Sequence, residues 1–198
     1  MAFSIFLCFF LRMRLRRFFI NDPIADGQLS RCARLERTDR AVASWRAMGT
    51  NRRAEIKMSD EEVYALLKDC KTATMATMHP DGSIHAVAMW YGFLDGVITV
   101  ETKAKSQKIR NLQRDPRVTF LVEAGERYEE LRGVEIVGTA KIIDDPDAIW
   151  ELGLSVWERY IGPYDETQRE ALQAMLAKRV LVTPEVTKVV SWDHRKLA

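Results

Sequence analysis

Strand-like segments that follow one another through tight turns are the feature that most limits the fold of this 198-residue chain. Residues 72–79 and 83–91 flank the turn signal Pro80-Asp81-Gly82, and a second one, Asp95-Gly96, precedes residues 97–101. Connections this short join antiparallel strands, because a parallel pair needs a crossover of a dozen or more residues. The pattern therefore excludes a doubly wound parallel sheet, in which a helix follows every strand.

Further strands and a set of helices complete the pattern. Strands are predicted at residues 118–122, at 134–143 and in the closing stretch, which divides into 179–182 and 186–192. Helices are predicted at residues 59–70, 103–114, 145–160 and 165–178, and Ser59 with Glu62 has the pattern of a capping box. About six antiparallel strands with short turns close into a small barrel. We therefore expect a mainly β protein with peripheral helices, built on a six-stranded antiparallel barrel.

Composition excludes several classes of protein. The chain is 47% hydrophobic and 29% charged, which is ordinary for a folded globule. Its three cysteines, Cys8, Cys32 and Cys70, are widely spaced and form no CxxC pair. This pattern indicates neither a disulfide framework nor a zinc site, and it predicts a reducing, cytoplasmic compartment.

The first 57 residues differ in charge from the rest. They carry 12 basic and 5 acidic residues, whereas residues 58–198 carry 18 and 23. The apolar run 1–11 comes before its arginines, unlike a secretory signal, and is too short to span a bilayer. A weak membrane-surface anchor, a basic arm for nucleic acid, and a disordered or non-native extension with initiation at Met48 or Met58 are the three interpretations. We favour the third, with the folded domain at residues 58–198, no nucleic-acid partner and no stable membrane insertion.

Basic residues concentrate where a strand gives way to a helix. Residues 103–117 hold six cations against Asp115 alone, within a body that is otherwise acidic. Lys103, Lys105 and Lys108 crowd the predicted helix start, the end of a helix that disfavours cations. A bound anion removes this conflict, and Ser106 adds a hydroxyl donor. The residues thus favour a phosphate site, with a solvated basic helix as the alternative.

Other common catalytic motifs are missing. The sequence has no GxxxxGK[ST], no GxGxxG after a strand, no HExxH and no GxSxG. His79, His85 and His194 fall in a turn, a strand and the C-terminal end, so we expect no metal site. No residue is assigned as catalytic.

The second strand combines small and large side chains. Alternation places Ala86, Ala88 and Trp90 on one face and His85, Val87, Met89 and Tyr91 on the other. Such a strand suits either a flat aromatic ligand or ordinary barrel packing. Next to a phosphate site, the first interpretation gains weight, because a phosphorylated aromatic cofactor needs both features.

Three stretches carry a family resemblance over residues 59–197. They are "TATMATMHPDGSIHAVAMWYGFLDGVITVETKAKSQKIRNLQRDPRVTFLVEAG", "VEIVGTAKIIDDPD" and "RVLVTPEVTKVVSWDHRKL". Together they resemble the flavin and deazaflavin split-barrel group, which includes pyridoxamine 5′-phosphate oxidase-like proteins. The sequence is most similar to the branch of F420-dependent deazaflavin reductases.

The resemblance implies a six-stranded FMN-binding type of split barrel and a homodimer with the cofactor at its interface. It implies an oxidoreductase that passes hydride from reduced F420 to a small, electron-poor organic substrate. The alternatives are an FMN-binding pyridoxamine 5′-phosphate oxidase-like enzyme and a non-catalytic cofactor or tetrapyrrole carrier. The cofactor-binding residues that it implies are Lys103, Lys105, Ser106, Lys108 and Asn111 for the phosphate, and His85, Val87, Met89 and Trp90 for the ring.

Overall fold

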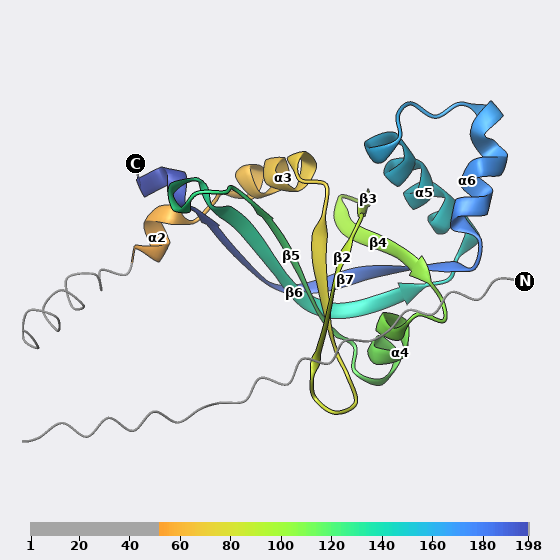
Figure 1. Ribbon diagram of the computed structural model, residues 1–198, viewed down its shortest axis with the longest axis horizontal. Coiled ribbons are helices and arrows are strands. Elements are labelled where there is room, and N and C mark those ends of the chain that lie inside the picture. The colour runs from red at the N-terminus through yellow and green to blue at the C-terminus, as the bar shows by residue number, and fades with distance from the viewer. Residues whose placement is uncertain (1–51, 198) are drawn as a thin grey trace, which may run out of the picture. The chain divides into compact units, whose positions relative to one another are not determined.

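The computed structural model describes residues 52–197 and is dominated by one antiparallel sheet. Its strands run in the order β2-β1-β5-β6-β7-β4-β3 and curl into a half-barrel (Figure 1). Their bounds are β1 Ala73–Met78, β2 Ile84–Met89, β3 Gly92–Leu94, β4 Val97–Lys103, β5 Arg117–Ala124, β6 Arg132–Ile143 and β7 Arg179–Asp193. The predicted mainly β class with an antiparallel split barrel is confirmed, although the sheet has seven strands instead of six.

Two strands differ from the sequence-based expectation. The turn at Asp95-Gly96 joins β4 to the additional short strand β3, and both turn residues have positive φ angles. The closing stretch, expected in two parts, is the single strand β7. Pro184 does not end this strand, because it lies opposite Ala140 of β6 and beyond Val182, the last residue of β7 that pairs with β4.

Helices lie around the sheet. They are α2 Arg53–Ile56, α3 Asp60–Asp69, α4 Gln107–Arg114, α5 Pro146–Tyr160 and α6 Arg169–Leu176, with single 3₁₀ turns at Tyr128–Glu130, Glu166–Gln168 and His194–Leu197. The predicted capping box is confirmed: the Glu62 amide donates to Ser59 Oγ at 3.3 Å, and the Ser59 amide donates to the Glu62 carboxylate at 2.7 Å. The helix expected at residues 165–178 begins with the second 3₁₀ turn.

The main core fills the inside of the curled sheet. Met75, Val100, Phe120 and Val134 are fully buried there, and Leu66 and Leu67 of α3 cover them. Separate apolar clusters join α5 and α6 to the other side of β7, through residues such as Leu152, Leu172 and Leu181. The core thus holds β1 and β4 rigidly, and these strands carry much of the candidate site.

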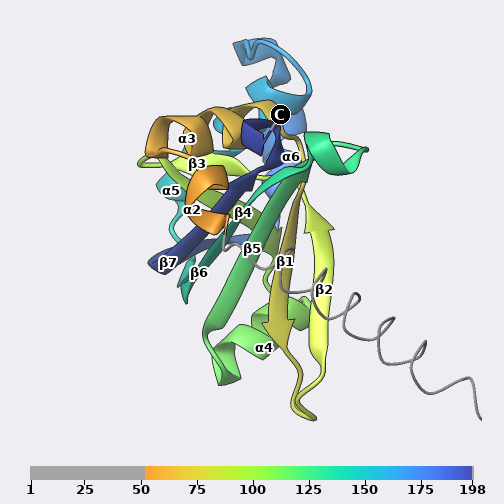
Figure 2. The same cartoon turned by 90° about the vertical axis from the view of Figure 1, so that its left-hand side faces the viewer.

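A short helix precedes α3. Figure 2 shows α2 beside β7, near the C-terminal end. Lys196 Nζ donates to the carbonyl of Lys57 at 2.8 Å, and the Met58 amide donates to Ser191 Oγ at 3.1 Å. Residues 53–57, assigned to the N-terminal extension from sequence, therefore contact the C-terminal segment, whereas residues 1–51 lie outside the described part. No helix within the described part is long and apolar enough to cross a membrane.

Candidate cofactor site

The junction between β4 and α4 differs from the prediction in where the helix begins. The helix α4 begins at Gln107 with Ser106 as its N-cap, so the predicted start at Lys103 is wrong. Lys103 is the last residue of β4 and pairs with Arg179 of β7, which keeps its backbone extended. Of the three lysines, only Lys108 lies in the first turn of the helix.

Lys108 lies among hydroxyl groups at this junction. Its Nζ donates to Thr102 Oγ1 at 3.0 Å, and Thr102 Oγ1 lies 3.4 Å from Ser106 Oγ. Ser106 makes no side-chain capping bond, so its hydroxyl is not engaged with the helix amides. Burial lowers the pKa of Lys108, and the positive charge of Arg179 lowers it further. An ammonium group with two hydroxyls beside it has the donor chemistry that a phosphate requires.

The other two lysines lie apart from Lys108. Lys103 Nζ donates to the carbonyl of Ala177 at 3.2 Å, next to the start of β7. Lys105 is exposed in the turn between β4 and α4. The structure thus brings Lys108 and Ser106 together, with Lys103 on the β7 side and Lys105 in the connecting turn.

Two charged residues that the sequence analysis missed complete the junction. Glu101 is 6% exposed, and Arg179 Nη1 lies 3.5 Å from its Oε1 atom. The second oxygen, Oε2, is buried and has no hydrogen-bond partner within residues 52–197. Burial raises the pKa of Glu101, whereas the charges of Arg179 and Lys103 lower it. The pairing of β4 with β7 brings Arg179 here from a distant part of the sequence, and no local sequence motif predicts this contact.

The buried carboxylate gives a stability prediction. The pKa of Glu101 in the folded protein lies above its ordinary value of 4.5, so the ionised form is disfavoured on folding. The wild type therefore loses stability as pH rises above about 4.5 and through the raised pKa. We expect Glu101→Gln to be more stable than wild type at neutral pH and to have a higher Tm, because glutamine resembles the neutral carboxyl that the buried position favours.

Thermal melting of wild type and Glu101→Gln at a series of pH values tests this expectation. The gain in Tm should shrink as the pH falls toward 4.5, where the wild-type carboxyl is also neutral. A variant that is less stable than wild type at pH 7 would show that the ion pair with Arg179 outweighs the burial of the charge.

Asn111 is fully buried on α4. Its Nδ2 donates to Thr77 Oγ1 of β1 at 3.0 Å, and its Oδ1 accepts from Gln107 Nε2 at 2.9 Å. The bond to Thr77 fixes α4 against β1, and the bond from Gln107 lies within α4, so Asn111 has a structural role at the junction. A direct contact of Asn111 with a phosphate stays a prediction.

Replacing Asn111 separates the two roles. We expect Asn111→Ala to lower the free energy of unfolding by about 1–3 kcal/mol, because Thr77 is left buried with an unpaired hydroxyl. Urea denaturation of the protein without cofactor measures the effect. Unchanged stability combined with weaker cofactor binding would instead assign Asn111 to the ligand.

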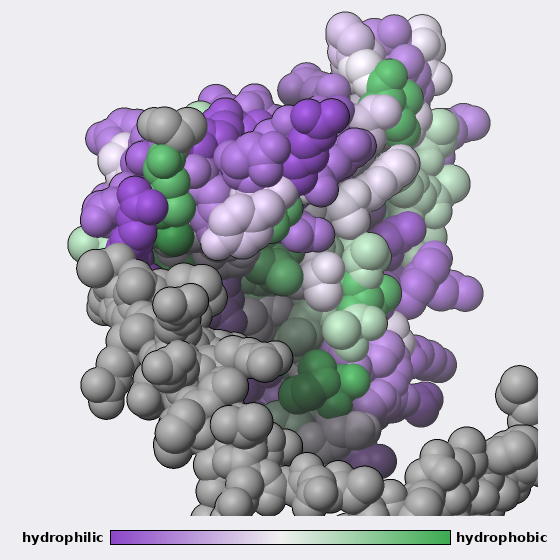
Figure 3. Space-filling model, turned by 60° about the vertical axis from the view of Figure 1, so that its left-hand side comes forward, coloured by the Kyte–Doolittle hydropathy of each residue, from purple (hydrophilic) through white to green (hydrophobic). Residues whose placement is uncertain are grey.

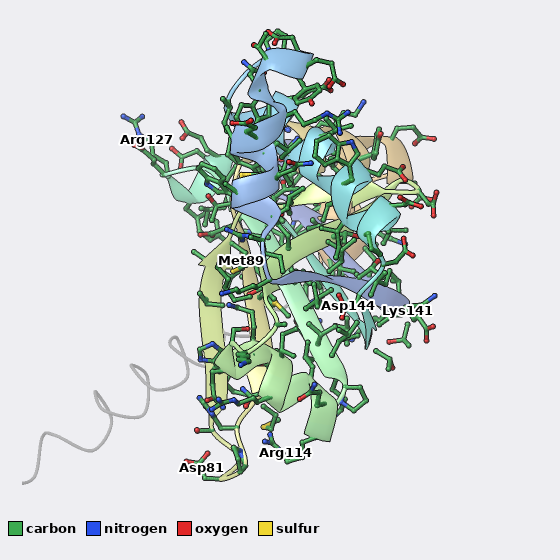
Figure 4. The ribbon with its side chains drawn as sticks, turned by 90° about the vertical axis from the view of Figure 1, so that its right-hand side faces the viewer. Asp81, Met89, Arg114, Arg127, Lys141 and Asp144 are labelled. Carbon is green, nitrogen blue, oxygen red and sulfur yellow. The ribbon has the colours of Figure 1, made fainter. Side chains whose placement is uncertain are left out.

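The hairpin of β1 and β2 borders the junction. Burial alternates along β2, with His85, Val87 and Met89 half-buried and the residues between them exposed, as predicted. His85 lies directly opposite Thr77, the partner of Asn111, so the inner face of β2 adjoins α4. Figure 4 shows Met89 along the hairpin and Asp81 at its tip, with Arg114 of α4 near the tip. The half-buried side chains of β2 thus lie on the inner surface of the hairpin, where Val87 and Met89 pack against the main core.

Trp90 lies outside this surface. It follows the end of β2, is 53% exposed, and stacks on Tyr160 of α5 with 4.4 Å between ring centroids. The Tyr160 hydroxyl is held by the Tyr91 amide and by the carbonyl of Lys71. Trp90 is therefore a rigid, exposed aromatic next to the hairpin, and its contact with a cofactor ring stays a prediction.

Two shallow hollows occur on the described surface. One, of about 380 Å³, lies on the outer face of β1, β5 and β6, and the other, of about 630 Å³, lies between α2 and β7. Neither hollow is lined by any of the nine residues predicted to bind the cofactor. Within residues 52–197, no group of three or more His, Cys, Asp or Glu side chains is arranged to hold a metal ion.

The curled antiparallel sheet with its helices defines a split-barrel protein of the flavin-binding type. The family model described as pyridoxamine 5′-phosphate oxidase matches residues 59–193, and the chain belongs to this family. Members of the family are mostly oxidoreductases. Among proteins with curated descriptions, none matches the chain.

Solved structures that are similar to the chain differ in sequence identity and in TM-score. A conserved hypothetical protein from Mycobacterium tuberculosis is 49% identical with a TM-score of 0.72, and the match covers 75% of this chain and 92% of that protein. An F420 reductase is 28% identical with a TM-score of 0.52, and the match covers 66% of this chain and 98% of that protein. A putative 5-nitroimidazole antibiotic resistance protein from Bacteroides thetaiotaomicron is 12% identical with a TM-score of 0.57, and the match covers 69% of this chain and 84% of that protein. At this identity the similarity shows the fold alone.

Proposed function

We propose that this protein is an F420-dependent oxidoreductase that reduces a small, electron-poor organic molecule. The observation that carries the proposal is the half-buried Lys108 with the hydroxyls of Thr102 and Ser106, on a helix that Asn111 joins to the hairpin with the half-buried face of β2. A phosphate fits the first group and a flat ring fits the second. The family membership and the similarity to an F420 reductase support the same class of cofactor.

Different residues hold the phosphate and the ring of the cofactor. Lys108 and Ser106 bind the phosphate, Lys103 and Lys105 add positive charge from the β7 side and from the connecting turn, and His85, Val87 and Met89 support the ring. When bound in its reduced form, F420 supplies the hydride. The apolar strand excludes water from the reacting face, and solvent provides the proton that the product needs, so the chain requires no dedicated acid.

FMN is the alternative cofactor, because it also combines a phosphate with a flat ring. The donor groups at the junction suit both molecules, and the similarity to an F420 reductase favours the deazaflavin. Binding without turnover would instead indicate a carrier of a cofactor or tetrapyrrole.

A second copy of the chain completes the site in this proposal. The outer face of β2 exposes Ile84 at 61%, together with Ala86 and Ala88, and Figure 3 shows apolar side chains at the surface of the sheet. This exposed apolar face supports a homodimer, and the position of the cofactor between the subunits is what the family resemblance implies.

An anaerobic turnover assay tests the proposed activity. Reduced F420 is mixed with nitroaromatic, quinone and enone acceptors and a catalytic amount of protein, and its reoxidation is followed by absorbance. We expect protein-dependent reoxidation with at least one acceptor. Reoxidation with none of these acceptors, by a protein that binds F420 tightly, would favour the carrier.

A further inference from the structure

Positive charge gathers where β4 ends and β7 begins. Lys103 and Arg179 are paired across the two strands, and Lys108 of α4 lies close enough to Arg179 for the two charges to repel each other. Figure 1 shows the end of β4, the start of β7 and α4 on the same side of the molecule. Glu101 is the acidic group beside Arg179, with Arg179 Nη1 3.5 Å from its Oε1 atom, and the charge of Lys103 acts on the same carboxylate.

Arg179 is fixed in place, but only one of its three guanidinium nitrogens makes a hydrogen bond within the described residues. Its Nε donates to the carbonyl of Met175 at 2.6 Å, which fixes the guanidinium plane. Its Nη1 lies 3.5 Å from Glu101 Oε1, and within residues 52–197 neither Nη atom makes a hydrogen bond. The side chain is 25% exposed, so a ligand has access to it. A guanidinium held by one nitrogen presents its remaining donors to a partner from outside the chain.

Charge balance points to the kind of partner. Lys108 and Arg179 repel each other, and Lys108 is already partly desolvated. Gathering like charges in this way is unfavourable unless an anion joins them. A phosphate provides that charge, and the planar fork of an arginine matches two of its oxygens.

We propose that Arg179 is a further residue of the anion site, binding the phosphate of the cofactor together with Lys108. This assignment rests on the proposed function for the identity of the ligand, but not for the presence of an anion site. It adds β7 to the elements that hold the phosphate. The left-handed turn at Lys178 places Arg179 beside β4, and the Ala104 amide closes the turn onto the Lys178 carbonyl at 3.0 Å.

The test uses inorganic phosphate as the probe and needs no cofactor. Isothermal titration of the full chain with phosphate, at constant ionic strength, compares wild type with Arg179→Gln, Arg179→Lys and the matched control Lys178→Gln. Arg179→Gln and Lys178→Gln each remove one positive charge from neighbouring positions, so general electrostatics affects both. Thermal melting confirms that each variant is folded.

We expect Arg179→Gln to bind phosphate roughly tenfold more weakly, which corresponds to ~1.4 kcal/mol. Lys178→Gln should stay within about twofold of wild type, and Arg179→Lys should fall between the two because it keeps the charge but loses the fork. Equal weakening by the two glutamine variants, or no phosphate binding by wild type, would overturn the assignment. If Arg179→Gln fails to fold, the comparison of Arg179→Lys with Lys178→Gln decides.

A parallel titration with F420 separates this inference from the proposed function. Binding of F420 that is equal in wild type and Arg179→Gln would refute the role of Arg179 and leave the function intact. Phosphate binding that depends on Arg179, in a protein that binds neither F420 nor FMN, would refute the function and leave the anion site intact.

Discussion

Replacing Lys108 with alanine is expected to weaken cofactor binding by roughly ten- to a hundredfold. A charge-assisted hydrogen bond to a phosphate contributes about 1.5–3 kcal/mol, and Lys108 is the cation placed beside Thr102 and Ser106. The fold should change little in stability, because the variant loses one hydrogen bond to Thr102 but also removes a partly desolvated charge. Lys108→Gln should behave in the same way, since the charge is what binds.

Fluorescence titration with the cofactor, beside thermal melting of the protein without it, measures both effects. Lys105→Ala and the double variant extend the series, because Lys105 lies exposed in the adjacent turn and is expected to contribute as well. Lys141→Ala, an exposed lysine on β6, is the matched control and should bind normally. Unchanged affinity in both single variants and in the double variant would mean that the basic run is only a solvated surface.

Replacing Ala86 with arginine is expected to dissociate the proposed homodimer, with the dimer dissociation constant raised by roughly a hundredfold or more. Ala86 is exposed on the outer face of β2 and pairs with Ala76 of β1, so the surface there is flat and apolar. A long charged side chain at the centre of such an interface would be buried without a partner. Because the site needs both subunits in this account, cofactor binding should be lost together with the dimer.

Analytical ultracentrifugation at micromolar concentration, followed by cofactor titration, tests the effect. Ala171→Arg on α6 is the matched control, since it makes the same change at an exposed helical position. The thermal stability of the Ala86→Arg monomer should be recorded to confirm that it is folded. A wild type that is monomeric under these conditions and still binds cofactor would contradict the dimeric site.

Much of the fold follows from local sequence signals. The turns at Pro80-Asp81-Gly82 and Asp95-Gly96 predict antiparallel pairing, and the capping box at Ser59 marks the start of α3 correctly. β3 was missed, because three residues are too few to show an alternating pattern. The continuity of β7 was missed as well, because a proline normally ends a strand, and the point at which β4 stops pairing with β7 is a property of the sheet.

The candidate site was predictable only where it is continuous in sequence. Lys108 and Ser106 stand together in the basic run, and the structure places them side by side through Thr102. Glu101 and Arg179 meet through strand pairing across a long stretch of chain, which no spacing rule reveals. The position of Trp90 against Tyr160 depends in the same way on how α5 packs beside the hairpin.

Equilibrium binding of F420 and FMN, measured in parallel on the purified full chain, tests the central claim most directly. The account predicts saturable binding of one cofactor per subunit, tighter for F420 than for FMN, and weakened in Lys108→Ala but not in Lys141→Ala. Tighter binding of FMN would transfer the proposal to a flavin enzyme. Binding of neither cofactor, or binding unaffected by Lys108→Ala, would contradict the account.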